Sequence, residues 1–145
     1  MVLLLNQSLA EFNSALENAS FTLVKKLPKE EIFIQADGRK LSRVFENLFN
    51  NCMKYTMPQT RVYLNVWKEE ADVVIELKNI ASYAMEFDGE RITERFVRGD
   101  SARSTEGSGL GLAIAKSYVS ACGGNLQVIV DGDLFKVVIR FQRIE

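Results

Sequence analysis

The stretch EGSGLGLAIAKSYVS, Glu106 to Ser120, joins a glycine-rich loop to an apolar run at helical spacing. Glycine is costly inside regular structure and useful where the backbone adopts positive φ or approaches another group closely. A glycine loop that leads into a helix often holds a phosphate, because free N–H groups and the positive end of the helix dipole meet there. The stretch is neither a P-loop nor the dinucleotide-binding fingerprint, and close helix packing is the alternative explanation of its glycines.

The segments around this stretch predict an α/β domain. Apolar periodicity predicts three helices, over about 5–16, from after Gly38 to near Pro58, and from the glycines to about Cys122, with Gly123-Gly124 as the cap. Runs of β-branched and aromatic residues predict strands at 21–27, 31–37, 61–70 and 71–79, and a hairpin over 125–142 that turns at Asp131-Gly132. Residues 80–108, with a short helix around 88–96, are typical of a long loop or lid. This order of elements predicts a two-layer α/β sandwich of mainly antiparallel strands.

Composition narrows the function classes. The 145 residues fit one domain, 1–145, and 47% hydrophobic with 26% charged residues is ordinary for a globular protein. A net charge of -1 gives no reason to expect a nucleic-acid partner. Cys52 and Cys122 lack metal-ligand spacing and are expected to be free thiols in a reducing cytosol. The sequence contains no histidine, which excludes an imidazole base, a catalytic triad and a histidine-bound metal.

A polar stripe lies beside the apolar face of the long helix. Asn47, Asn51 and Lys54 are spaced by four and three residues, so they project from one side, and Tyr55 lies where the stripe meets the core face. An amide oxygen suits Mg²⁺, an ammonium suits phosphate oxygens, and an aromatic ring can stack on a base. A solvated helix flank is the alternative interpretation of the same pattern.

Four arginines precede the glycines, at positions 91, 95, 98 and 103. Arginines near a phosphate loop can neutralise the charge that develops during phosphoryl transfer. Singly, each arginine is also typical of solvated surface.

Two long motifs resemble one family. RVFENLFNNCMKYT (residues 43–56) resembles the N box of the histidine-kinase catalytic domain, the ATP-binding fold shared with gyrase-type ATPases. ERFVRGDSARSTEGSGLGLAIAKSYVSACGG (94–124) resembles its F box, G2 box and following helix. The resemblance extends from about the first helix to the end. It implies the Bergerat (GHKL) fold, a mixed, mainly antiparallel sheet with helices on one face and an ATP lid.

The resemblance also implies the site. Asn51 would ligate Mg²⁺ with Asn47 nearby, Lys54 and Arg98 would contact phosphates, and Tyr55 would pack on adenine. The resemblance assigns catalytic roles to Asn47, Lys54 and Arg98. The residues expected to bind ATP are Asn51, Lys54, Tyr55, Asn79, Arg98, Thr105, Gly107, Gly109, Leu110, Gly111 and Leu112.

The sequence departs from the family pattern in two places. The G1 box usually reads Asp-x-Gly-x-Gly, whereas KNIASYA (78–84) places Asn79 at the aspartate, Ala81 at the first glycine and Tyr83 at the second. Asn79 can still accept a hydrogen bond from the adenine amino group, weakened by about 1 kcal/mol because it is uncharged. Near the end, Leu134 replaces the hydroxyl residue that often precedes the phenylalanine.

These observations predict the catalytic domain of a bacterial sensor histidine kinase, using ATP and Mg²⁺. Asn47 stands where gyrase-type ATPases carry their glutamate base, and Glu46 points about 100° away around the helix, so no base in the chain activates water. The expected partners are a dimerisation domain carrying the acceptor histidine and a downstream response regulator. The isolated domain is expected to be monomeric and cytoplasmic, within a membrane-anchored parent. A regulatory pseudokinase module and an anti-sigma-type serine kinase are the alternatives.

Overall fold

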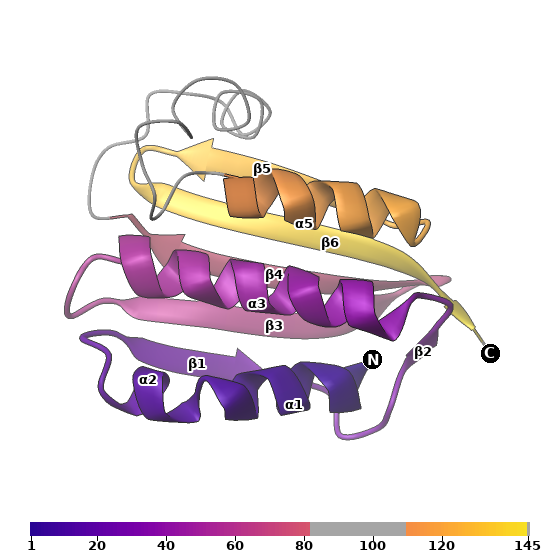
Figure 1. Ribbon diagram of the computed structural model, residues 1–145, viewed down its shortest axis with the longest axis horizontal. Helices are drawn as coiled ribbons and strands as arrows, with labels where there is room; N and C mark the ends of the chain where they lie inside the picture. Colours follow the sequence, from indigo (N-terminus) through magenta and orange to yellow (C-terminus); the bar gives the residue numbers. More distant parts are fainter. Residues whose placement is uncertain (82–109, 145) are drawn as a thin grey trace.

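The computed structural model describes residues 1–81 and 110–144 as one sheet with helices on a single face (Figure 1). The sheet order is β1-β3-β4-β6-β2, and β5 pairs with β6 as well. β1 runs parallel to β3, and the other strand pairs are antiparallel. The elements are α1 (Val2–Glu11), α2 (Asn13–Glu17), β1 (Thr22–Lys26), β2 (Phe33–Ile34), α3 (Gly38–Tyr55), β3 (Arg61–Glu69), β4 (Asp72–Ile80), α5 (Leu110–Ala121), β5 (Asn125–Asp131) and β6 (Leu134–Ile144).

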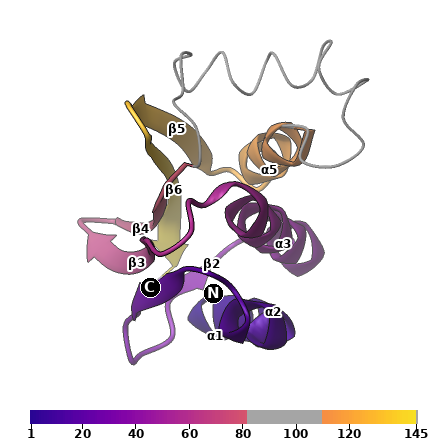
Figure 2. The ribbon, with the colours of Figure 1, turned by 90° about the vertical axis from the view of Figure 1, so that its left-hand side faces the viewer.

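The two layers follow from the apolar faces of the elements. Seen along the sheet, α1, α3 and α5 all lie on one side of the strands (Figure 2). Every second residue of the central strands is buried against these helices, for example Val62, Leu64 and Val66 on β3. The predicted fold class, a two-layer α/β sandwich with a mainly antiparallel sheet, is confirmed.

Helix α3 forms the centre of the helical layer. One face of it is buried in the core, through Leu41, Val44, Phe45, Leu48, Phe49 and Cys52. The helix begins where Asp37 accepts hydrogen bonds from the backbone N–H groups of Arg39 and Lys40. It ends at Tyr55, because Thr56 already has an extended backbone, with φ -72° and ψ 132°. The predicted end near Pro58 is therefore confirmed.

The prediction of one continuous N-terminal helix is wrong, because the structure has two helices there. Phe12, with φ -99° and ψ 4°, separates α1 from α2. Its ring packs edge-on against Phe49 of α3, with ring centroids 5.7 Å apart. This long-range contact holds Phe12 at the break, and Asn13, a weak helix former, begins the second helix.

The predicted strand 31–37 is shorter in the structure, where only Phe33 and Ile34 pair with β6. The acidic residues at its two ends cap helices instead. Glu31 accepts hydrogen bonds from the N–H groups of Val2 and Leu3 at the start of α1, and Asp37 caps α3. Because the residues at both ends of this segment cap helices, only the short stretch between them is left to form a strand.

The predicted turns are confirmed. Glu70 (φ 55°) joins β3 to β4, Gly132 (φ 61°) joins β5 to β6, and Gly123 (φ 79°) follows α5. Positive φ is the conformation in which glycine carries no steric penalty. The predicted loop over 80–108 falls mainly on residues 82–109, outside the described residues. Within the described ranges, no helix is long and apolar enough to cross a membrane.

Candidate functional site

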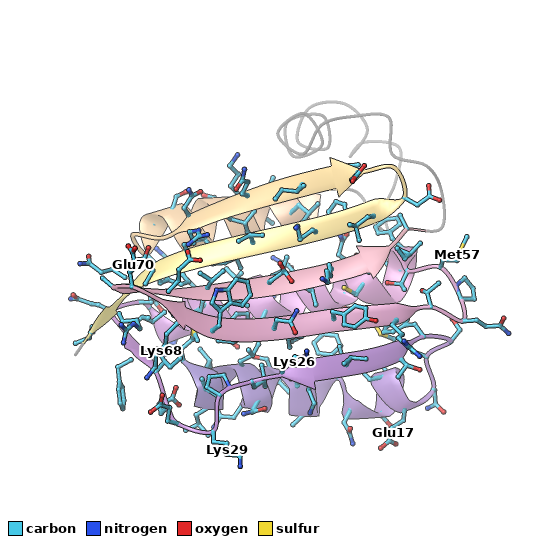
Figure 3. The ribbon with its side chains drawn as sticks, turned by 180° about the vertical axis from the view of Figure 1, so that it is seen from behind. Glu17, Lys26, Lys29, Met57, Lys68 and Glu70 are labelled. Carbon is cyan, nitrogen blue, oxygen red and sulfur yellow. The ribbon has the colours of Figure 1, made fainter. Side chains whose placement is uncertain are left out.

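Among the residues singled out from the sequence, those that the structure describes lie on elements that meet at one end of the molecule. The last turn of α3, the end of β4, the start of α5 and the β5–β6 turn all lie at this end (Figure 1). In the view of the open sheet face, Met57 lies at this end and Glu70 at the opposite one (Figure 3). Two hydrogen bonds tie the segments together, from Met57 N to Ile80 O at 2.8 Å and from Ala81 N to Asp133 O at 2.7 Å.

The polar stripe on α3 has the predicted arrangement. Asn47 and Asn51 are half-buried at the edge of the core face, and Lys54 is exposed in the last turn. Tyr55, half-buried, ends the helix. With about 1.5 Å of rise per residue, the seven steps from Asn47 to Lys54 span roughly 10 Å along the helix. An amide oxygen and an ammonium thus lie along a line that a triphosphate can follow.

Asn47 lies in the seam between α3 and α5. A Cβ atom at Gly111, in the first turn of α5, would be 3.8 Å from both Cβ and Cγ of Asn47. The Asn47 Nδ2 atom is buried and has no hydrogen-bond partner among the residues that the structure describes. An unpaired buried amide is costly, so this donor marks a place where a ligand acceptor would be stabilising.

Asn79 and Thr56 form a buried polar pair at the same end. The Asn79 Nδ2 donates a hydrogen bond to Thr56 Oγ1 at 3.0 Å, and the two residues are 5% and 8% exposed. Asn79 is paired with Phe135 on β6, and Thr56 forms a β-bridge with Ala81. The structure therefore brings the expected base-binding residue next to the end of α3. Thr56 was missed from the sequence; a hydroxyl residue directly after Tyr55 was the available signal.

The structure describes only some of the remaining residues that were expected in the site. Arg98, Thr105, Gly107 and Gly109 lie outside the described residues, as do the other arginines before the glycines and Tyr83. Leu110 begins α5, and Leu112 is buried in the core. Leu134 begins β6, paired with Ile80.

The donor set limits how a metal could be held. Within 1–81 and 110–144, no group of three or more histidine, cysteine, aspartate or glutamate residues could hold an ion. Burial raises the pKa of the Cys52 thiol to about 12, so this cysteine stays protonated in the core. A Mg²⁺ ion, which prefers oxygen and keeps several waters, fits a single amide oxygen supplemented by the oxygens of a phosphate ligand. The stripe on α3 is compatible with that kind of site.

Comparison with known proteins gives one family and several relatives. The sequence pattern described as "Histidine kinase-, DNA gyrase B-, and HSP90-like ATPase" matches residues 36–143. The sensor histidine kinase WalK of Bacillus subtilis is 34% identical over 107 residues, which cover 71% of this chain and 18% of that protein. The probable sensor protein PcoS of Escherichia coli is 35% identical over 108 residues, 72% of this chain and 23% of that protein.

A solved structure supports the same fold. The catalytic domain of the histidine kinase ThkA has a TM-score of 0.79 at 18% identity, covering 97% of this chain and 90% of that chain. The likeness includes α1, α2 and β1, which precede the residues matched by the family pattern. The chain spans about a fifth of the length of the curated relatives named above.

Proposed function

The chain belongs to the family of histidine kinase-, DNA gyrase B- and HSP90-like ATPases, and from this premise we propose that it is the ATP-binding catalytic domain of a sensor histidine kinase. It binds ATP with Mg²⁺ and presents the γ-phosphate to a histidine on a linked dimerisation domain. The family resemblance inferred from the N, F and G2 boxes is confirmed by this match. Relatives that are sensor kinases support the transfer to histidine, and the chain itself contains no histidine to accept a phosphate.

One observation carries the proposal. The stripe of Asn47, Asn51 and Lys54 ends beside the Asn79–Thr56 pair and borders the first turn of α5 at Gly111. A nucleotide with its phosphates along the α3–α5 seam and its base near Asn79 would meet each of these groups. The buried Nδ2 of Asn47, which has no partner within residues 1–81 and 110–144, would gain an acceptor in that arrangement.

The residues act by binding and charge stabilisation. Asn51 would hold Mg²⁺ through its amide oxygen, and the ion, when bound, neutralises charge on the phosphates. Lys54 contacts phosphate oxygens as a point charge, and Arg98 is proposed to reach the terminal phosphate. The Asn47 amide cannot take a proton, and the carboxylate next to it on α3, that of Glu46, points about 100° away around the helix. The chain therefore favours transfer to an external nucleophile over hydrolysis by activated water.

Calorimetric titration with ATP, with and without Mg²⁺, tests the binding step. Saturable Mg²⁺-dependent binding is expected, and Asn51→Ala should weaken it at least tenfold. Asn50→Ala is the matched control, because Asn50 is the exposed neighbour on the same helix and projects away from the stripe. Absence of binding up to millimolar ATP would refute the proposal.

Phosphate transfer needs a second component. With a separately supplied histidine-bearing dimerisation domain and labelled ATP, label should appear on histidine and then pass to a response regulator. Label on a partner serine would favour the serine-kinase alternative instead. We also propose a cytoplasmic location, since ATP is the phosphate donor.

A second candidate function follows from the G1 box. Asn79 supplies an uncharged amide where the family usually has aspartate, which favours a weaker nucleotide site of regulatory type. Such a module would bind ADP or ATP and transfer no phosphate. Nucleotide binding without label on any acceptor would distinguish it from the kinase.

A further inference from the structure

The Asn79–Thr56 pair has a chemical property that a carboxylate in the same place would lack. Both side chains carry a hydrogen-bond donor and an acceptor, the amide through Nδ2 and Oδ1 and the hydroxyl through its single oxygen. In the structure Nδ2 donates to Oγ1. A half-turn of the amide about its terminal torsion exchanges two groups of nearly equal size, after which Oγ1–H donates to Oδ1.

The backbone around the pair holds both residues in place through either state. Thr56 N donates to Cys52 O at 3.1 Å, Met57 N donates to Ile80 O at 2.8 Å, and Thr56 is bridged to Ala81. Asn79 lies within β4 and is paired with Phe135. The amide flip therefore needs only a side-chain rotation, with the hydrogen bond between the two residues kept in each state.

With the base placed at Asn79, as proposed above, each state would present a different group to it. With Nδ2 on Thr56, the acceptor Oδ1 faces away from the hydroxyl; after the flip, the donor Nδ2 does. An exocyclic amino group on a purine matches the first state, and an exocyclic carbonyl matches the second. An aspartate at position 79 would offer an acceptor only, and its charge would repel a carbonyl oxygen.

We infer that the Asn79–Thr56 pair makes the nucleotide site accept 6-oxo purine nucleotides about as well as 6-amino ones. The inference rests on the proposed function, because it places the base at Asn79. Asn79 is the specificity-determining residue, and Thr56 is the positioning residue that satisfies the inner end of the amide in both states.

Titration with ADP and with IDP in the presence of Mg²⁺ tests this inference, since inosine carries a carbonyl where adenosine carries the amino group. The wild-type chain should bind the two with dissociation constants within about 5-fold of each other. Asn79→Asp should retain ADP and weaken IDP by more than about 30-fold, because a carboxylate cannot donate to the carbonyl. The wild-type ratio needs no variant, so the test stands even if a buried carboxylate prevents folding.

Thr56 is tested by the same two ligands. Thr56→Val keeps the shape and removes the hydroxyl, so both ADP and IDP should bind at least 5-fold more weakly, and Thr56→Ser should restore both. An unchanged melting temperature in the valine variant would separate this effect from a fold defect. Binding of ADP with exclusion of IDP by more than about 30-fold in the wild type would overturn the inference and leave the proposed function intact. Binding of neither would overturn both.

Discussion

Replacing Gly111 by alanine separates a packing role from a ligand role at the start of α5. The added methyl group meets no clash, since its Cβ would lie 3.8 Å from the nearest atoms of Asn47. Alanine is favoured over glycine in a helix by about 0.5–1 kcal/mol, so the free energy of unfolding should rise by about 0.5 kcal/mol near this helix end. For a chain of this size the melting temperature should rise by roughly 2 °C.

The same substitution should weaken nucleotide binding. The methyl group would occupy the space 3.9 Å from Asn47 Oδ1, in the seam where we place the phosphates. We expect a loss of ATP affinity of about tenfold or more, equivalent to about 1.4 kcal/mol. Thermal unfolding and calorimetric titration on the same preparation measure the two opposite effects.

Gly38→Ala is the matched control. Gly38 begins α3, and a Cβ there would meet nothing within 4 Å. This variant should be as stable as the wild type or slightly more so, and should bind ATP unchanged. If Gly111→Ala gains stability and keeps wild-type ATP affinity, then the glycine is needed neither for helix packing nor for the ligand, and the phosphates do not lie in the seam.

Three further predictions concern the scaffold. Gly124→Ala would place Cβ 2.5 Å from Phe141 Cε1, and the clash should lower the free energy of unfolding by about 1–3 kcal/mol in urea titration. Phe45→Ala, at a fully buried position, should lower it by about 3–5 kcal/mol by the same measurement. Partial burial raises the pKa of Glu31, but hydrogen bonds from the amino terminus and from backbone N–H groups outweigh this and hold the pKa below 4.5. The capping carboxylate therefore stabilises α1 fully above pH 4.5 and loses this effect as pH falls through the lowered pKa. Glu31→Gln should cost about 1 kcal/mol at pH 7 and flatten that acid dependence, while Glu30→Gln, on the exposed surface, should change little.

Local patterns were sufficient to predict α3 and the two hairpins. The apolar face of α3 recurs at helical spacing, and Asp37 supplies a cap directly before it. Glu70 and Gly132 stand at the two turns with positive φ, each between runs that alternate in burial. In these segments the decisive interactions join residues close together in the sequence, so periodicity and turn chemistry were enough.

Features that depend on distant contacts could not be predicted. The break at Phe12 depends on a ring 37 positions later, in Phe49, and the short β2 depends on Glu31 reaching back to α1. The Asn79–Thr56 hydrogen bond joins residues 23 positions apart on different elements. The N-box pattern predicted the stripe of site residues on α3, but nothing local indicated which hydroxyl would meet the amide of Asn79.

The core and the candidate site share α3, and this arrangement makes their roles separable. The apolar face, where Phe45 and Phe49 stack at 6.5 Å between ring centroids, holds the helix against the sheet. The polar stripe lies beside that face, so substitutions of Asn51 or Lys54 would remove the proposed ligand contacts and little packing. A nucleotide that binds only the folded chain stabilises it by about 2.7 kcal/mol at a hundred times its dissociation constant. Stripe variants should therefore unfold like the wild type without nucleotide and lose this added stability with it. Core variants on the same helix should show the reverse. They should be less stable than the wild type both without and with nucleotide, and nucleotide should still add the same stabilisation. A stripe variant that lost stability without nucleotide would show that the polar residues hold the fold together rather than the ligand.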